Sequence, residues 1–314
     1  MLIDATTYPS LHSELGLSSG QPAQPESQKE QQCSTTLIRT SEDLRREKLS
    51  DRDIYPVAKN SMSNRVALLI TNIKFTDEKL HRKGAEKDEA NMDKLLTDLG
   101  YEVVKHTNLT GKAIDDALNE FSKHPKLKET DSVLVVIMSH GKLGTVLGVN
   151  WKKKISDNEI PDEFPIDNIY KHLGPEKCPA LLNKPKIIII QACRGGGEGS
   201  VLVTDGANPA VVSDTAGEGN IEDDGLRFVN KEKDFISLLS CTPDTVSYRH
   251  SGHGSFLIQF VVEVFNTFAQ KEDIEELFRK VMQRFEDFSI PAKRQMPTKD
   301  RCTLTKRFYF FPGL

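Results

Sequence analysis

Two stretches of the sequence decide the fold, and each is an apolar run that ends in reactive residues. Residues 132–141 read SVLVVIMSHG, and residues 186–195 read KIIIIQACRG. Each apolar run has the length of a strand and would be buried on both faces, which is typical of parallel sheets. Active sites of such sheets gather beyond the carboxyl ends of the strands. We therefore expect His140 and Cys193 to meet at one rim of the sheet, although 53 positions separate them.

The segments around these two strands alternate between strand and helix patterns. Further strands are predicted at Val66–Thr71, Tyr101–Lys105, Phe235–Ser240 and Thr303–Phe311. Apolar residues at helical spacing predict helices within residues 84–99, 110–121, 256–268 and 274–285, with Gly100 ending the first and Thr110 capping the second. The predicted fold class is α/β, with a mostly parallel sheet covered by helices on both faces.

Two segments differ in composition from this pattern. Residues 1–60 are rich in polar residues and proline and show no sustained helical stripe, so we expect a flexible N-terminal extension before a domain at 61–314. Residues 195–230 hold Gly, Asp, Asn and Thr with few apolar residues. A loop of this length inside a compact fold is usually functional, and we expect an exposed linker there.

Composition excludes several classes of protein. Of the 314 residues, 37% are apolar and 28% charged, as in globular proteins, and no apolar run approaches the length that crosses a bilayer. A net charge of −4 without a dense basic block argues against nucleic acid as a partner. The five cysteines have neither CxxC spacing nor a histidine placed to complete a zinc site. We expect reduced, cytoplasmic thiols, no metal and no cofactor.

A thiol beside an imidazole is suited to nucleophilic acyl transfer. The imidazole of His140 can take the proton of Cys193 and later give it to the leaving amine. Glycines next to both residues let backbone N–H groups approach a substrate carbonyl. For an arbitrary pair, a buried cysteine and a strand-end histidine with structural roles would be the more frequent outcome. The sequence motifs around these two residues favour catalysis.

Two other segments resemble ligand-binding motifs, but their sequences do not support ligand binding. Residues 195–199 read GGGEG after a strand, but they lack the Lys-Ser/Thr of a phosphate-binding loop and open a linker instead of a helix. The aromatic run at 308–311 is better explained as a buried closing strand, in a sheet or a dimer seam, than as a ligand groove.

The segment Gln191-Ala192-Cys193-Arg194-Gly195, with a histidine about 50 residues upstream, is the signature of the caspases. The resemblance extends from about Ile54 to Leu314 and includes Gly84-Ala85-Glu86, Thr242-Pro243-Asp244 and Tyr248-Arg249-His250. The sequence is most similar to that of the inflammatory caspases at residues 54–56, 295–298 and 303–305. This implies a six-stranded caspase-like fold and a cysteine endopeptidase that cleaves after aspartate.

The resemblance also assigns roles to individual residues. It implies Cys193 as the nucleophile, His140 as the catalytic imidazole oriented by the carbonyl of Leu80, and the backbone of Gly141 and Cys193 as oxyanion donors. Two arginines would clamp the substrate carboxylate, because guanidinium groups can fork onto it. The implied substrate-binding residues are Arg82, Gln191, Arg249, Ser255, Val246, Tyr248 and His250. Tyr248 stands where the family usually has tryptophan, and Ser251 where it often has proline, which predicts a smaller and more polar pocket.

By the same resemblance, the enzyme is a zymogen that is cut in its linker. A large subunit of about 61–205 and a small one of about 225–314 would result, and two such units would form a homodimer through Thr303–Phe311. Processing is expected at Asp205, Asp214 or Asp224, although these acidic residues could equally be solubilising charge. The expected partners are protein substrates, with no nucleic acid and no membrane, while adaptor or inflammasome proteins are left open. The N-terminal 60 residues are too few and too polar for the recruitment domain that inflammatory caspases carry.

Two alternatives stay open. One is an executioner enzyme that serves apoptosis instead of inflammation or pyroptosis. The other, of a different class, is a catalytically silent regulator that dimerises with an active caspase. Such proteins usually lack the nucleophile or a pocket arginine, and this sequence keeps Cys193, His140, Arg82 and Arg249.

Overall fold

The computed structural model describes residues 34–152, 160–194, 230–243, 247–288 and 294–313. Its centre is a six-stranded sheet in the order β11-β8-β7-β3-β1-β2. Five strands are parallel to one another: β1 (Val66–Thr71), β2 (Glu102–Thr107), β3 (Val133–Met138), β7 (Lys186–Gln191) and β8 (Phe235–Leu239). The edge strand β11 (Thr298–Asp300) is antiparallel to β8. The predicted α/β class and the six-stranded, mainly parallel sheet are confirmed.

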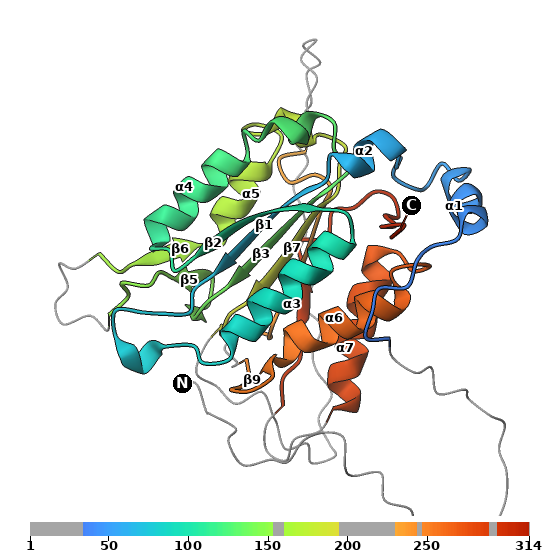
Figure 1. Cartoon of the computed structure of the whole chain (residues 1–314). Coiled ribbons are helices and arrows are strands. Elements are labelled where there is room, and N and C mark those ends of the chain that lie inside the picture. Colours follow the sequence, from blue (N-terminus) through green and yellow to red (C-terminus); the bar gives the residue numbers. More distant parts are fainter. Residues whose placement is uncertain (1–33, 153–159, 195–229, 244–246, 289–293, 314) are drawn as a thin grey trace, which may run out of the picture.

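Helices cover both faces of the sheet (Figure 1). On one face, α4 (Gly111–Phe121) and α5 (Asp167–Leu173) pack on alternate residues of the strands, such as Leu68 in β1. On the other face, α3 (Ala85–Asp98), α6 (Phe256–Phe268) and α7 (Ile274–Asp287) pack on the intervening residues, such as Leu69. Because both faces are buried, the central strands are apolar throughout.

Local sequence explains where these helices begin. The hydroxyl of Thr110 accepts a hydrogen bond from the Ala113 N–H, as the predicted cap of α4 requires. Helix α3 follows Gly84, whose φ of +87° lies in the left-handed region. A Cβ atom there would also come within 2.7 Å of the carbonyl oxygens of His250 and Ser251. Glycine is therefore needed both for the turn and for the close approach of the 250–251 backbone.

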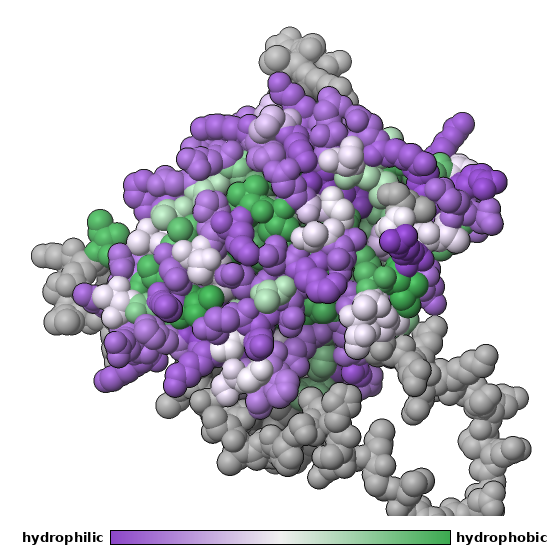
Figure 2. All heavy atoms as spheres, viewed as in Figure 1, coloured by the Kyte–Doolittle hydropathy of each residue, from purple (hydrophilic) through white to green (hydrophobic). Residues whose placement is uncertain are grey.

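Short strands extend the sheet's carboxyl side. A three-stranded sheet consists of β4 (Gly141–Lys142), β5 (Thr145–Leu147) and β6 (Glu163–Pro165), and a two-stranded hairpin of β9 (Arg249–His250) and β10 (Gly254–Ser255). On the face shown in Figure 2 the molecule is predominantly hydrophilic, with small hydrophobic areas between polar side chains. Among the described residues, no helix has the length and apolar character needed to cross a membrane.

The expectation of a flexible extension through residue 60 needs a correction from residue 34 onward. Residues 34–63 include α1 (Glu42–Leu49) and α2 (Lys59–Ser63), and Ile54, Tyr55 and Val57 are buried in the core. The hydroxyl of Tyr55 donates to Asp234 at 2.6 Å. A few buried side chains separated by polar residues hold this segment, so it shows no helical stripe. Residues 1–33 lie outside the described residues.

The predicted closing strand at Thr303–Phe311 is wrong. The sheet instead ends on β11, and residues 303–311 make one isolated bridge, Arg307 to Ile54. Phe308, Tyr309, Phe310 and Phe311 are all buried, so they do not alternate between a covered and an open face. Arg65 explains part of this packing, because its buried guanidinium donates to the carbonyl of Phe310 at 2.8 Å. The run fills the core from a non-regular segment.

Candidate active site

The register of β3 and β7 brings the two reactive segments together. Met138 and Gln191 are paired at the carboxyl ends of these adjacent strands, and the Ser139 N–H donates to the Gln191 carbonyl at 3.1 Å. His140 and Cys193 each follow two residues after this pair. The expectation that both segments end at one rim of the sheet is confirmed.

His140 is buried, with 8% of its surface exposed, and its Nε2 lies 2.8 Å from the carbonyl oxygen of Leu80. A carbonyl oxygen only accepts, so Nε2 carries the proton and Nδ1 keeps the lone pair. Burial, and secondly the positive charge of Arg82, lower the pKa of His140 from 6.5 to about 3. The ring also contacts Phe75, with 5.0 Å between the centroids. The resting imidazole is therefore neutral and oriented from its Nε2 side.

Cys193 is buried at 9% exposure, and its Sγ lies 3.9 Å from the carbonyl oxygen of Ser247. The four described cysteines, Cys178, Cys193, Cys241 and Cys302, are free thiols. Cys241 is also close to this segment, since its Sγ lies 3.7 Å from the carbonyl of Ala192. Burial does not distinguish Cys193 from Cys178 and Cys241, whereas Cys302 is exposed. What sets Cys193 apart is its place at the end of β7 beside His140.

Gly141 fits between β5 and the Cys193 backbone with no room for a side chain. A Cβ atom there would lie 2.8 Å from the Cys193 carbonyl oxygen and 2.9 Å from that of Thr145. Real side chains do not tolerate such distances, so glycine keeps this backbone in place. The amide groups of residues 141 and 193 consequently belong to one compact backbone region.

Arg82 is almost fully buried, at 1% exposure, beneath the same rim. Its Nη1 donates to the carbonyls of Asn72, at 2.8 Å, and Met138, at 3.2 Å, which follow β1 and end β3. Its Nε has no hydrogen-bond partner among the described residues. Burial, and then the charge of Arg249, lower the pKa of Arg82 to about 9. A buried cation with a free donor is prepared for an anionic ligand.

Arg249 reaches the same place from the hairpin β9–β10. Its Nε donates to the carbonyl of Lys83 at 2.8 Å, and its charge lowers the pKa of both Arg82 and His140. Gln191 is buried, and its Oε1 has no partner within the described part of the chain. The structure therefore brings Arg82, Arg249 and Gln191 close to His140 and Cys193.

The remaining predicted binding residues are spread over the hairpin and the segment before it. The backbone of Tyr248 is held by Gln295, whose Oε1 accepts from the Tyr248 N–H at 2.8 Å. His250 and Ser255 pair with Gly254 and Arg249 across β9 and β10. Val246 and the predicted processing residues Asp205, Asp214 and Asp224 lie outside the described residues.

Two buried polar residues at this site were missed by the sequence analysis. Gln295 holds Tyr248 as described above, and it also donates to the carbonyl of Ser240 at 2.7 Å. Asp88, on α3, accepts two hydrogen bonds from Ser255. Neither residue lies in a catalytic sequence motif. Only their burial, which depends on the tertiary structure, reveals them.

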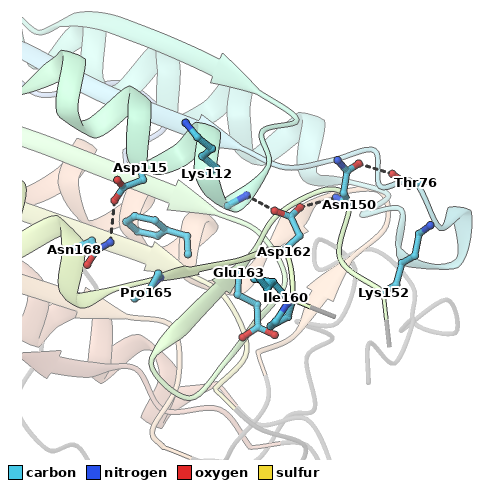
Figure 3. Close-up of a pocket in the computed structure, with 13 residues that line it drawn as sticks. Thr76, Lys112, Asp115, Asn150, Lys152, Ile160, Asp162, Glu163, Pro165 and Asn168 are labelled. Carbon is cyan, nitrogen blue, oxygen red and sulfur yellow. Dashed lines mark hydrogen bonds between the residues drawn. The ribbon is translucent and has the colours of Figure 1, made fainter. Parts of the chain in front are cut away.

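A separate cavity of about 800 Å³ opens near the start of α4 (Figure 3). Asp162 is one of the residues that line it, and its carboxylate accepts hydrogen bonds from the backbone N–H groups of Gly111 and Asn150. Neither Cys193 nor His140 lines this cavity. Within the described ranges, no group of three or more His, Cys, Asp or Glu residues is placed to hold a metal ion.

The caspase domain of peptidase family C14 matches residues 64–309, and the chain belongs to this family. It is 49% identical over 264 residues to caspase a of Danio rerio, covering 84% of this chain and 66% of the relative. It is 41% identical over 261 residues to caspase-1 of Rattus norvegicus, covering 83% and 63%. The crystal structure of caspase-1 from Spodoptera frugiperda has the same fold, with a TM-score of 0.66, 23% identity, and coverage of 83% and 94%. The chain thus spans about two thirds of the length of these two curated relatives.

Proposed function

We propose that this chain is an endopeptidase that cuts proteins after aspartate, with Cys193 as nucleophile and His140 as its acid–base partner. The observation that carries the proposal is the pairing of Met138 with Gln191 at the ends of β3 and β7. His140 and Cys193 each follow this pair by two residues, and Arg82 is buried near the same rim. Membership of the caspase family supports the same chemistry.

The geometry suggests how each group would act. Nδ1 of His140 takes the thiol proton, and the Cys193 thiolate attacks the carbonyl carbon of the scissile peptide bond. The N–H groups of Gly141 and Cys193 stabilise the oxyanion that forms. His140 then protonates the leaving amine, and a water molecule hydrolyses the remaining thioester and restores the thiol.

Selectivity for aspartate would come from Arg82 and Arg249. The free Nε of Arg82 and the guanidinium of Arg249 can both donate to one carboxylate. A substrate without that carboxylate would leave two cations close together with no anion between them. Such a site rejects uncharged side chains strongly.

We further propose that the chain acts in the cytoplasm as a processed homodimer of large and small subunits. The free thiols of the described cysteines agree with a reducing compartment. The sheet ends on β11, whose outer edge has no strand partner among the described residues, and a second copy can pair there.

The pathway we propose is inflammatory signalling, because the relatives include caspase-1 of several vertebrates. A panel of reporter peptides tests both levels of the proposal. Cleavage after aspartate and not after asparagine or glutamate would support the reaction. An apolar or aromatic preference three residues before the aspartate would favour the inflammatory role, and an aspartate preference there the executioner role. A folded, dimeric protein that cleaves none of these peptides would favour the silent regulator.

A further inference from the structure

Asp88 is a completely buried carboxylate on α3. Both of its oxygens accept hydrogen bonds from Ser255, Oδ1 from the backbone N–H at 2.7 Å and Oδ2 from the hydroxyl at 2.6 Å. Hydrogen bonds to a charged acceptor are stronger than those between neutral groups. The hairpin β9–β10 is therefore tied to α3 through one side chain.

The fit between this hairpin and α3 leaves no free space. Gly254 has a φ of +92°, and a Cβ atom there would lie 2.3 Å from Oδ1 of Asp88. Across the hairpin, Gly254 pairs with His250, whose carbonyl lies against Gly84. In the next pair along the hairpin, Ser255 lies opposite Arg249. The position of Asp88 consequently sets the position of Arg249.

The bond to Asp88 also changes what Ser255 can do. A serine hydroxyl has one proton, and here the Ser255 hydroxyl donates that proton to Oδ2 of Asp88. The Ser255 hydroxyl therefore cannot donate to a substrate carboxylate at the same time. The direct polar contact that the family resemblance implies for Ser255 becomes an indirect role, in which the residue transmits the position of Asp88.

The charge of Asp88 has a second effect on the free enzyme. Arg82 and Arg249 repel each other before substrate binds, and the negative charge of Asp88 opposes that repulsion and raises the pKa of Arg82. Burial raises the pKa of Asp88 itself, while the two bonds from Ser255 and the two arginines act in the opposite direction.

We propose that Asp88 is a positioning residue for the aspartate pocket, which holds the β9–β10 hairpin so that Arg249 faces Arg82 when the substrate carboxylate arrives. This inference rests on the proposed function and names a residue that positions one of the two arginines proposed to select aspartate. Asp88 touches neither the substrate nor the reacting atoms, and it acts through Ser255 and Arg249.

The test uses two peptide aldehydes that differ only in ending with aspartate or asparagine, measured as reversible inhibitors of Cys193 alkylation. Asp88→Ala should weaken binding of the aspartate aldehyde at least thirtyfold and that of the asparagine aldehyde less than threefold. The rate at which iodoacetamide alkylates Cys193 should stay within twofold. Asp88→Asn, which keeps an acceptor for the Ser255 N–H, should recover binding to within fivefold of wild type.

Asp93→Ala is the matched control, because Asp93 lies on the same helix and its 2.8 Å ion pair with Lys105 is partly exposed; it should change nothing. Folded Asp88→Ala protein that binds the aspartate aldehyde within twofold of wild type would overturn the proposal, and so would equal losses for both aldehydes. If Asp88→Ala does not fold, Ser255→Ala replaces it in the test. Ser255→Ala should weaken binding of the aspartate aldehyde at least fivefold, and a loss of less than twofold would contradict the proposal. Wild-type protein that does not prefer the aspartate aldehyde would instead refute the proposed function.

Discussion

Nε2 of His140 donates a hydrogen bond to the carbonyl oxygen of Leu80, 60 residues earlier in the chain, at 2.8 Å. This bond fixes the tautomer of the imidazole, and burial keeps the ring neutral. The chain thereby holds a neutral imidazole in place at the end of β3, and the cost in folding stability appears only when pH falls.

His140→Gln should make the protein less sensitive to acid. The pKa of His140 is about 3 in the folded protein and near 6.5 in the unfolded chain, so only the unfolded state binds a proton between these values. Stability from this group is full above pH 6.5 and is lost as pH falls toward 3. Between pH 7.5 and pH 5 the wild type should lose ~2 kcal/mol more free energy of unfolding than the variant. Urea denaturation at both pH values measures this, and equal losses would contradict the assigned pKa.

Cys193→Ala should abolish cleavage of a reporter peptide that ends in aspartate, since Cys193 is the described cysteine that follows β7 directly at the rim where β3 leads into His140. Cys241→Ala is the control, because Cys241 is also buried and free and lies near the same backbone. It should keep most of the activity. A Cys193→Ala protein with a tenth of wild-type activity would show that the nucleophile lies elsewhere.

Arg249→Ala should reduce kcat/KM on aspartate substrates by roughly 10² to 10³. Removing one partner of a buried charge pair costs about 3–5 kcal/mol. Arg279→Ala is the control, because Arg279 pairs with Glu276 on the exposed side of α7. Steady-state kinetics of both variants decide the matter. Activity of Arg249→Ala within twofold of the parent would exclude an arginine clamp.

Wild-type protein should cut its own linker, and mass spectrometry should then find new N-termini at Gly206 or Gly225. Asp205 and Asp224 each have an apolar residue three positions earlier and glycine directly after, and Asp214 is the third candidate. Cutting would free the ends to rearrange around the site. The Cys193→Ala protein, mixed with none of the wild type, should stay whole. Full activity from an intact chain would show that the linker does not control this enzyme.

Tyr55→Phe should lower the free energy of unfolding by about 1–3 kcal/mol, because it leaves the buried Asp234 without its 2.6 Å donor and the Thr305 N–H without its acceptor. Ser63→Ala removes a hydroxyl bond at an exposed position and should have little effect. Urea denaturation of both variants measures the difference. No loss in Tyr55→Phe would mean that residues 34–60 do not stabilise the domain.

The central strands were predictable because strands that are buried on both faces have continuous apolar sequences. The rim that holds the candidate site was predictable from the same runs, because parallel strands end at the same edge of a sheet, and the structure adds the register of Met138 with Gln191. Strand β11 was not predictable in this way. Its residues, Thr298, Lys299 and Asp300, are polar and at most half-buried, and they pair with β8 through the backbone alone.

Asp88 illustrates a second limit of sequence analysis. It lies among charged residues of α3, where a solvated surface would be the ordinary expectation. It is buried only because a hairpin 167 residues away folds over it. Tertiary contacts of this kind leave no periodic signal.

The order of strands in the sheet has a consequence for the processed enzyme. Strand β7 precedes the linker and β8 follows it, yet these two strands are paired along five residue positions. A cut between them would leave two polypeptides that complete one another's core, so separating them would mean unfolding both. Unfolding would then be a bimolecular equilibrium, and the thermal midpoint of the cut enzyme should rise with protein concentration while that of the intact chain does not.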